Sequence, residues 1–345
     1  MIYLDGNILK KLIKNILISK SVDREAAECV SEGLIQTSLR GIDSHGINLF
    51  PHYCRAVEAG RINKKPKISI EQNASSVAIV DADHAFGHHS GSVAVQHAIK
   101  MAKESGIGAV GVKNSSHFGS AAYFAFQANK ENCIGMAFTN GDALVKIYNS
   151  KEIFFGTNPI CFTAPLKNEE PFCIDMATSQ VAWNKVQNYK RLNMKLEEGW
   201  AYDVDGKETL DAKKAESLVS IGKYKGYGLG MMVDILCAVL VGGVISKDML
   251  SMHKAPISEK RRVSHFFIVI DISKFIYIDI FKNSLQEMVD RIRKYEKSDT
   301  EDVMVAGDPE KKSYKKRSKE GIPVDDIKFD EFLAISKQFE KALIK

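Results

Sequence analysis

The stretch Arg40-Gly41-Ile42-Asp43-Ser44-His45-Gly46 ends a helical pattern and brings a carboxylate, a hydroxyl and an imidazole together between glycines. Histidine titrates near neutral pH, so a neighbouring hydroxyl that fixes its tautomer can make it a proton donor. Asp-Ser is also ordinary helix-capping chemistry, and a single loop histidine is more often a bystander than a catalyst. A second stretch, Asn114-Ser115-Ser116-His117-Phe118-Gly119, repeats the pattern of hydroxyl, imidazole and glycine. Two such stretches in one chain favour catalysis, with His45 and His117 as candidates for the proton-transferring group.

Composition places the chain among soluble globular enzymes rather than disordered or fibrous proteins. Its 345 residues are 45% hydrophobic and 26% charged, and the formal net charge is +5. The excess charge comes mostly from lysine, which favours solvated helix faces over a surface for polyanions. The basic run 311–319 could engage nucleic acid, but solvated lysines explain it more simply and no aromatic stacking platform accompanies it. We therefore expect no nucleic-acid partner.

The cysteine pattern and the hydropathy favour a cytoplasmic protein. The six cysteines form no C-x-x-C pair and no zinc-finger spacing, so we expect reduced thiols, no disulfide and no structural metal. No secretory signal is evident at the N-terminus. The longest apolar run, residues 229–245, contains Asp234 and several glycines and is short for a bilayer span. It is predicted to form a buried helix, and we expect no membrane partner.

Hydrophobic periodicity indicates a mixture of helices and short strands. Short strands that end in small polar residues would deliver hydroxyls, amides and backbone N–H groups to one edge of a sheet, where α/β proteins usually bind small ligands. Helices are predicted over residues 9–17, 23–41, 50–59, 90–104, 121–129 and 281–295 and from 329, and strands over 76–81, 109–112, 134–139, 160–164, 172–174 and 268–272.

Two glycine-rich segments imitate nucleotide-binding motifs. Gly106 to Gly111 reads G-x-G-x-x-G, but a helix precedes it and a β-rich run follows, which is the reverse of the order that a dinucleotide-binding turn requires. Gly226 to Gly230 does open a helix, but it follows Lys223-Tyr224-Lys225 rather than a buried strand. A Rossmann loop is therefore rejected at both places. Lys225 beside a helix start remains able to meet a phosphate.

Several motifs together resemble one family. They are Arg40 to Gly46, Ser116-His117-Phe118-Gly119, Gly156-Thr157-Asn158-Pro159, Asp175-Met176-Ala177-Thr178, Lys225-Gly226-Tyr227-Gly228 and, near the end, Lys319 to Asp326. Their order across nearly the whole chain resembles the non-Rossmann malate/L-lactate dehydrogenase family. That family also includes ureidoglycolate, sulfolactate and diketogulonate oxidoreductases.

The resemblance implies an α/β fold in which a non-Rossmann mixed sheet binds the nicotinamide cofactor. We expect residues 76–280 to form this cofactor-binding domain. A helical segment, residues 1–75, is expected to pack with a C-terminal helical segment, residues 281–345. The resemblance also implies a homodimer, with the active site between the domains and near the subunit interface.

The resemblance further assigns roles to individual residues. His45 would be the general acid or base, with Ser44 orienting it, and His117 is a second candidate for proton transfer. The cofactor would be NAD, with NADP as the alternative. Its expected contacts are His117, Phe118, Gly119, Ser120, Ala121, Thr157, Asp175, Met176, Ala177, Lys225, Gly307, Asp308 and Pro309.

Hydride transfer to a 2-oxo acid needs one group that exchanges a proton with the substrate oxygen and a cation or N–H donors that hold the carboxylate. The family usually carries an arginine where this chain has Leu49, and leucine cannot replace a bidentate guanidinium. Arg40, Arg55 or Arg61 could compensate. Malate or lactate is the expected substrate. The alternatives are a diketogulonate- or ureidoglycolate-type activity, or a cofactor-binding homologue with impaired catalysis.

A histidine cluster near residue 88 departs from the family pattern. His88 stands where the family more often has glutamine, and His84 and His89 lie nearby. Three histidines could hold a metal, but no carboxylate and histidine set of known ligand spacing surrounds them. A glycine-rich helix start with polar side chains is the favoured interpretation, and no metal site is expected.

Overall fold

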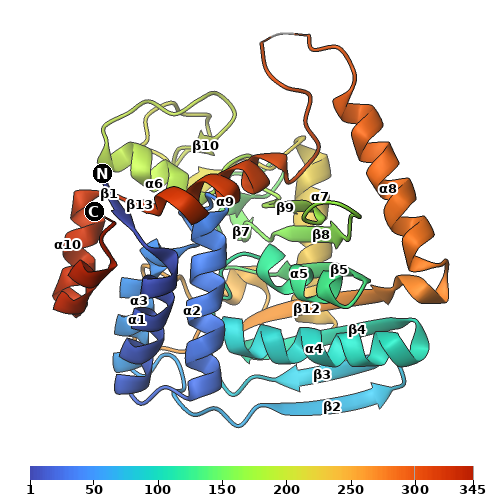
Figure 1. Cartoon of the computed structure of the whole chain (residues 1–345). Coiled ribbons are helices and arrows are strands. Elements are labelled where there is room, and N and C mark those ends of the chain that lie inside the picture. Colours follow the sequence, from blue (N-terminus) through green and yellow to red (C-terminus); the bar gives the residue numbers. More distant parts are fainter. Residues whose placement is uncertain (299, 345) are drawn as a thin grey trace.

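A seven-stranded mixed sheet forms the centre of the structure, a computed structural model that describes residues 1–298 and 300–344 (Figure 1). Only β3 and β4 are parallel neighbours, and every other adjacent pair in this sheet is antiparallel. The predicted α/β fold with a mixed sheet is confirmed. The strand order is β2 (Ser69–Ala74), β3 (Val77–Asp81), β4 (Ile107–Ser115), β12 (Val263–Asp271), β5 (Cys133–Thr139), β8 (Ile160–Ala164) and β9 (Phe172–Met176).

The central strand β12 is longer than predicted. Expected over residues 268–272, it begins at Val263 and pairs with both β4 and β5. Its first half contains Ser264 and His265, which break the apolar pattern, yet both are fully buried. Both ring nitrogens of His265 bond to hydroxyl groups, and the backbone N–H of Ser264 donates to Asn140 Oδ1, whereas the Ser264 hydroxyl has no partner among the described residues. β4 is also longer than the predicted strand 109–112, because its first glycine and its polar end belong to the strand.

Helices cover both faces of the sheet. α4 (Gly87–Ser105) and α5 (Ala122–Lys130) contact β4, β12 and β5. A helical segment formed by α7 (Tyr224–Asp234) and a π-helical turn (Ile235–Val239) contacts the same strands. The prediction of a buried helix over residues 229–245 is only half right. Val233 and Cys237 are buried against the sheet, whereas Val239 and Leu240 are 65% and 60% exposed.

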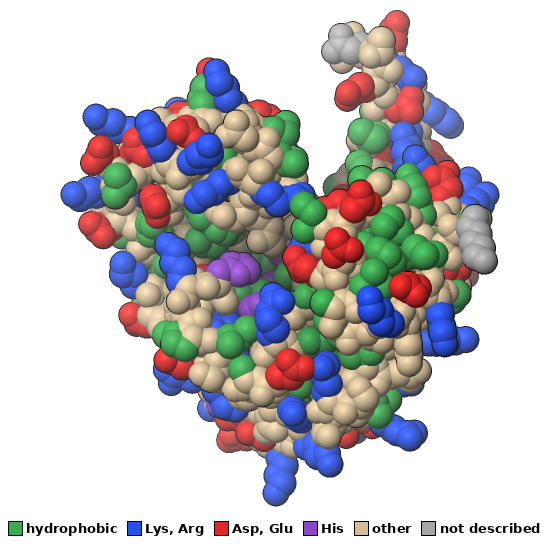
Figure 2. Space-filling view, turned by 90° about the vertical axis from the view of Figure 1, so that its left-hand side faces the viewer, with side chains coloured by type: hydrophobic (Ala, Val, Ile, Leu, Met, Phe, Trp, Pro, Cys, Tyr) green, Lys and Arg blue, Asp and Glu red, His purple; other side chains and the backbone are tan. Residues whose placement is uncertain are grey.

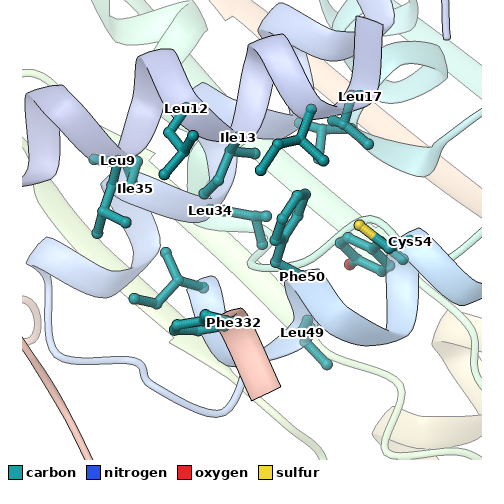
Figure 3. Close-up of a cluster of buried hydrophobic side chains, with 14 of the residues drawn as sticks. Leu9, Leu12, Ile13, Leu17, Leu34, Ile35, Leu49, Phe50, Cys54 and Phe332 are labelled. Atoms are coloured by element: carbon teal, nitrogen blue, oxygen red, sulfur yellow. The ribbon is translucent and has the colours of Figure 1, made fainter. Parts of the chain in front are cut away.

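The N-terminal helices form a second core with the end of the chain. α1 (Gly6–Ser19), α2 (Arg24–Leu39) and α3 (Phe50–Glu58) bury their apolar faces against α10 (Asp326–Ile335). Figure 3 shows Ile13, Leu34, Phe50 and Phe332 meeting in this cluster. Burial of each such side chain contributes about 1.5–3 kcal/mol. β1 (Ile2–Leu4) pairs with β13 (Ile322–Val324), so the two ends of the chain lie side by side.

The structure differs from the expected segment boundaries at two places. β2, which ends at Ala74, belongs to the sheet, although it falls within the expected helical segment 1–75. α8 (Ile278–Arg293) contacts the turn after β12 and extends along the side of the molecule away from α1–α3 (Figure 1). The C-terminal contact with α2 is made instead by α9 (Asp308–Glu320).

A third, smaller hydrophobic core lies outside the central sheet. It joins α6 (Trp183–Arg191) to a four-stranded sheet of β10 (Ala201–Tyr202), β11 (Ser217–Leu218), β6 (Val145–Lys146) and β7 (Ile153–Phe155). The polar segment of residues 186–222 is therefore partly ordered around Trp200. Across the whole described part of the chain, no helix combines the length and the apolar character that crossing a bilayer requires.

Candidate active site

His45 lies in the turn between α2 and α3. The turn requires glycine at position 46, because a Cβ atom there would lie 2.1 Å from Oγ of Ser38. That hydroxyl accepts a hydrogen bond from Ile47 N at 2.8 Å and so closes the turn. Asp43 forms an ion pair with Arg317 of α9, with 3.0 Å between Oδ2 and Nη2. Asp43 therefore anchors the loop to the C-terminal helix and does not face the imidazole.

Ser44 and His45 form a hydrogen-bonded pair at the wall of a cavity. Ser44 Oγ lies 2.8 Å from Nδ1 of His45, and Nε2 of His45 has no hydrogen-bond partner in the part of the chain that the structure describes. Burial disfavours the charged ring and lowers the pKa of His45 to about 4. When the Nδ1–H of the neutral ring donates to the Ser44 hydroxyl, Nε2 is left unprotonated and can accept a proton on the cavity side.

His117 lies beside His45 and is fixed by a tyrosine. The two imidazole rings are stacked with 5.6 Å between their centroids. The hydroxyl of Tyr53, on α3, lies 2.8 Å from Nδ1 of His117, and Gly119 N–H also donates to this atom at 3.4 Å. Because the amide can only donate, Nδ1 is the acceptor and the neutral ring carries its proton on Nε2. Burial lowers the pKa of His117 well below its usual value.

Two buried aromatic rings, of His265 and Phe118, pack next to the loop that carries His117. His265 of β12 bonds through both ring nitrogens, to Thr139 Oγ1 at 2.7 Å and to Ser115 Oγ at 2.8 Å. Phe118 stacks on His265 with a centroid distance of 4.6 Å and is fully buried. Phe118 therefore supports the cavity floor, although it was expected to contact the cofactor. His265 was not singled out in the sequence, since its hydrogen-bond partners come from two other strands, β5 and β4.

The strand ends line a cavity of about 590 Å³ that also contains His45 and His117. A second cavity, of about 310 Å³, adjoins it, and both are lined by Asp175 and Ile42. The Asp175 carboxylate accepts hydrogen bonds from Ser120 Oγ at 2.7 Å and from Ala122 N at 2.9 Å. Of the expected cofactor contacts, His117, Gly119, Ser120, Ala121, Thr157, Asp175, Met176 and Ala177 line the larger cavity, and Gly307 and Pro309 line the smaller one.

Small side chains and free backbone at two adjoining cavities fit an elongated dinucleotide. Gly119 has a φ of +76°, and a Cβ atom there would lie 2.6 Å from Nε2 of His88, so the close approach of backbone and helix α4 requires glycine. Gly307, with a φ of +95°, plays the same part beside Cys173 at the smaller cavity. Figure 2 shows histidine side chains at the bottom of a hollow on one face of the molecule.

Comparisons with known proteins identify the family. The sequence pattern of the malate/L-lactate dehydrogenase family matches residues 5–332. The chain belongs to this family. A malate dehydrogenase of Pyrococcus abyssi is 35% identical over 97% of this chain and 96% of its own. A ureidoglycolate dehydrogenase (NAD(+)) of Escherichia coli is 34% identical over 81% of this chain and 80% of its own.

A solved structure agrees with this assignment. The sulfolactate dehydrogenase of Methanocaldococcus jannaschii has a TM-score of 0.90 at 32% sequence identity and covers 99% of this chain and 98% of its own. The chain is thus a nicotinamide-dependent dehydrogenase of small hydroxy acids, as the resemblance implied.

Besides Phe118, two residues that the family resemblance placed at the cofactor, Lys225 and Asp308, line neither cavity of this dehydrogenase. Lys225 is exposed in the first turn of α7. Asp308 is buried in an ion pair with Arg293, with 3.0 Å between Oδ2 and Nε, and it also accepts a hydrogen bond from Val305 N. This ion pair fixes the Gly307 turn, so Asp308 shapes the smaller cavity indirectly.

The larger cavity has an apolar lining residue at the position where the family usually carries arginine. Leu49 lines it together with Met252. None of the three arginines that could compensate lines this cavity: Arg40 pairs with Glu170 beside the smaller one, Arg55 is exposed on α3, and Arg61 donates to backbone carbonyls of residues 252–256. The guanidinium that does line the cavity belongs to Arg261, just before β12.

The histidine cluster at the start of α4 does not gather metal ligands within the described residues. His88 is fully buried among Tyr53, Tyr123 and Phe124, and neither of its ring nitrogens has a partner among the residues described. Burial lowers the pKa of His88 to about 3. The ring therefore acts as a neutral packing element behind Gly119.

Proposed function

We propose that this dehydrogenase moves a hydride between NAD and a 2-hydroxy or 2-oxo acid of about the size of malate or lactate. The observation that carries the proposal is the pair of imidazoles, His45 and His117, which share one cavity with the strand-end residues Thr157 and Asp175. Two neutral rings held in fixed orientations at such an edge suit proton exchange with a substrate oxygen.

In this proposal each side chain has one task. His45 exchanges the proton with the substrate oxygen through Nε2, and Ser44 fixes the ring orientation. His117, held by Tyr53, donates a hydrogen bond to the same oxygen. When bound, the nicotinamide supplies or accepts the hydride. Because the pKa of His45 is low, the neutral ring is ready to accept a proton when the hydroxy acid is oxidised.

We propose that the dinucleotide spans both cavities and bends at Asp175. NAD is the first choice, with NADP as the alternative, since the name of the Escherichia coli relative states NAD(+). The residues that would hold it are Ser120, Ala121, Thr157, Met176, Ala177, Gly307 and Pro309.

We also propose a cytoplasmic homodimer. Its support is an exposed apolar strip on the helical segment that crosses the sheet, where Met231, Ile235, Val239 and Leu240 are between 45% and 65% exposed. Exposed strips of this kind usually mark contacts between protein chains. Six free thiols suit a reducing compartment. Light scattering on a sizing column distinguishes a dimer from a monomer.

An activity panel tests the function. The protein should oxidise NADH, or NADPH more slowly, in the presence of oxaloacetate, pyruvate, 2,3-diketogulonate or the oxidised form of ureidoglycolate. The variant His45→Ala should lose more than 99% of turnover, since general acid–base catalysis contributes about 100-fold or more, while its affinity for NADH stays within twofold. His97→Ala, whose ring contacts Gln72 of the edge strand β2 and lines neither cavity, is the control and should keep full activity.

Other outcomes of this panel are equally informative. If His45→Ala keeps most of its activity, proton transfer belongs to another group, with His117 next. Silence of the wild type with every acid and both cofactors would overturn the proposal. NADH binding without turnover would then support a homologue with impaired catalysis.

A further inference from the structure

Arg261 presents an unused pair of N–H groups to the larger cavity. Its side chain is almost fully buried, and its Nε donates to the carbonyl oxygen of Leu250 at 2.8 Å. Its Nη2 donates to the Asp142 carboxylate. Its Nη1 has no acceptor among the described residues. This atom is not fully enclosed by the protein, so a ligand can reach it. We infer that Arg261 binds the carboxylate of the 2-oxo or 2-hydroxy acid.

The position of Arg261 suits this task. It lines the same cavity as His45, His117 and Leu49. Its charge also acts on His117 and on Tyr53, which holds the His117 ring. In a 2-oxo acid the carboxylate is attached directly to the reacting carbon, so the cation that holds it must stand beside the group that exchanges the proton.

Arg261 is held rigidly before any ligand binds. The Asp142 carboxylate that pairs with it also accepts a hydrogen bond from Met252 N at 3.3 Å. Arg61 fastens the same loop through the carbonyl oxygens of Met252 at 3.1 Å and Pro256 at 2.8 Å. A guanidinium fixed on one side by a carboxylate and a carbonyl can turn only its remaining edge to a ligand. Such preorganisation lowers the cost of binding.

Around Arg261 the buried positive charges outnumber the negative charges. Arg61 and Arg261 are both buried and share Asp142 as their nearest acid. The other acid that acts on Arg61, Glu259, is exposed. The neighbouring imidazoles of residues 45, 52 and 117 are neutral near pH 7, because burial lowers their pKa. One ligand carboxylate therefore balances the excess positive charge, and a buried cation gains most from such a partner.

The lining of the larger cavity also indicates the substrate class, and this step rests on the proposed function. Leu49 and Met252 give the cavity an apolar wall, and a second carboxylate placed against them would lose its hydration without gaining a partner. Lys254 stands at the exposed mouth, where solvent weakens its attraction. We therefore assign a preference for monocarboxylic 2-oxo acids with a short uncharged side chain, such as pyruvate or 2-oxobutyrate, over dicarboxylic ones such as oxaloacetate.

The test compares three variants with the wild type. Arg261→Gln should raise the KM for pyruvate by about 30-fold or more, since hydrogen bonds to charged groups are the strong ones, and Arg261→Lys should recover only part of the loss. The affinity for NADH should stay within twofold. Leu49→Arg should raise the ratio of kcat/KM for oxaloacetate over pyruvate by at least tenfold. Arg55→Gln, on an exposed helix face, is the control and should match the wild type.

A binding measurement separates this inference from the proposed function. Oxamate, an unreactive monocarboxylate analogue of pyruvate, should raise the melting temperature of the wild type with NADH, and Arg261→Gln should abolish that shift. The double variant Asp142→Asn with Arg261→Gln avoids an unpaired buried carboxylate and should show the same loss while remaining folded. An unchanged KM and an unchanged oxamate shift in Arg261→Gln would overturn the role of Arg261. A wild type that prefers oxaloacetate to pyruvate would overturn the substrate class, and absence of all turnover with oxamate binding intact would count against the proposed reaction alone.

Discussion

The hydroxyl of Tyr53 lies 2.8 Å from Nδ1 of His117 and joins a helix of the N-terminal core to a loop of the central sheet. The loop fixes where His117 stands, and the tyrosine fixes how its ring is turned. Because His117 stacks on His45, the orientation of one ring limits that of the other. The geometry of the imidazole pair thus depends on contact between the two cores.

Removing the Tyr53 hydroxyl should impair catalysis more than folding. Tyr53→Phe keeps the buried ring but leaves Nδ1 of His117 with only the long hydrogen bond from Gly119 N. A lost hydrogen bond to a buried group costs about 1–3 kcal/mol, so we expect kcat/KM to fall about tenfold. Tyr189→Phe, whose ring packs on Trp200 in the third core, is the matched control. Equal effects of the two variants on activity would contradict the role of Tyr53.

The low pKa of His45 predicts an asymmetric dependence of turnover on pH. Oxidation of the hydroxy acid needs the neutral ring, which persists down to a pKa of about 4. The kcat/KM for oxidation should therefore stay level from pH 8 to pH 5. Reduction needs a proton on the ring, so its kcat/KM should rise steadily as the pH falls over the same range. Short initial-rate assays in both directions measure these profiles. A fall in the oxidation rate centred near pH 6.5 would show that His45 titrates like an exposed histidine.

Buried neutral histidines should make the fold sensitive to acid. Burial lowers the pKa of His88 and of His265 to about 3, against about 6.5 in an unfolded chain. The unfolded state therefore binds more protons, and the free energy of unfolding falls as the pH drops from 6.5 towards 3. Each ring contributes up to about 1.4 kcal/mol per pH unit. Urea unfolding at pH 7.5 and pH 5.0 should show this loss.

The variant His88→Gln isolates one of these rings. It removes the titrating group while leaving a side chain of similar size among the same aromatic neighbours. Its loss of stability between pH 7.5 and pH 5.0 should be smaller than that of the wild type by up to about 1.4 kcal/mol per pH unit. If the two proteins lose equal stability, His88 is not the neutral buried ring that the structure shows.

Most regular elements could be predicted from the sequence because their periodicity is strong. α1 carries a clear apolar stripe at Leu9, Ile13 and Leu17, and the helix is found where it was expected. β2 was missed because it is an edge strand with all six residues exposed, so no alternation marks it. α9 was predicted only as a basic run, since its residues are nearly all polar.

The proton-exchange candidates could also be found in the sequence, whereas their partners could not. Ser44 and His45 are adjacent, so their pairing is local. Tyr53 meets His117 across 64 residues of chain, and Asp142 meets Arg261 across 119. Contacts between such distant residues depend on how β12 enters the centre of the sheet, which the local pattern does not specify.

Two glycines in helices should respond in opposite ways to the same substitution. Gly33 lies in α2, where a Cβ atom would approach Cδ2 of His88 to 2.4 Å. Gly33→Ala should therefore lower the free energy of unfolding by about 1–3 kcal/mol, as overpacking does. Gly228 lies in α7 with nothing within 4 Å of the added atom, so Gly228→Ala should raise it by about 0.5–1 kcal/mol through helix propensity alone. Urea unfolding of both variants measures the contrast. A stabilised Gly33→Ala would show that the His88 ring can move aside, and the support of Gly119 by that ring would then be in doubt.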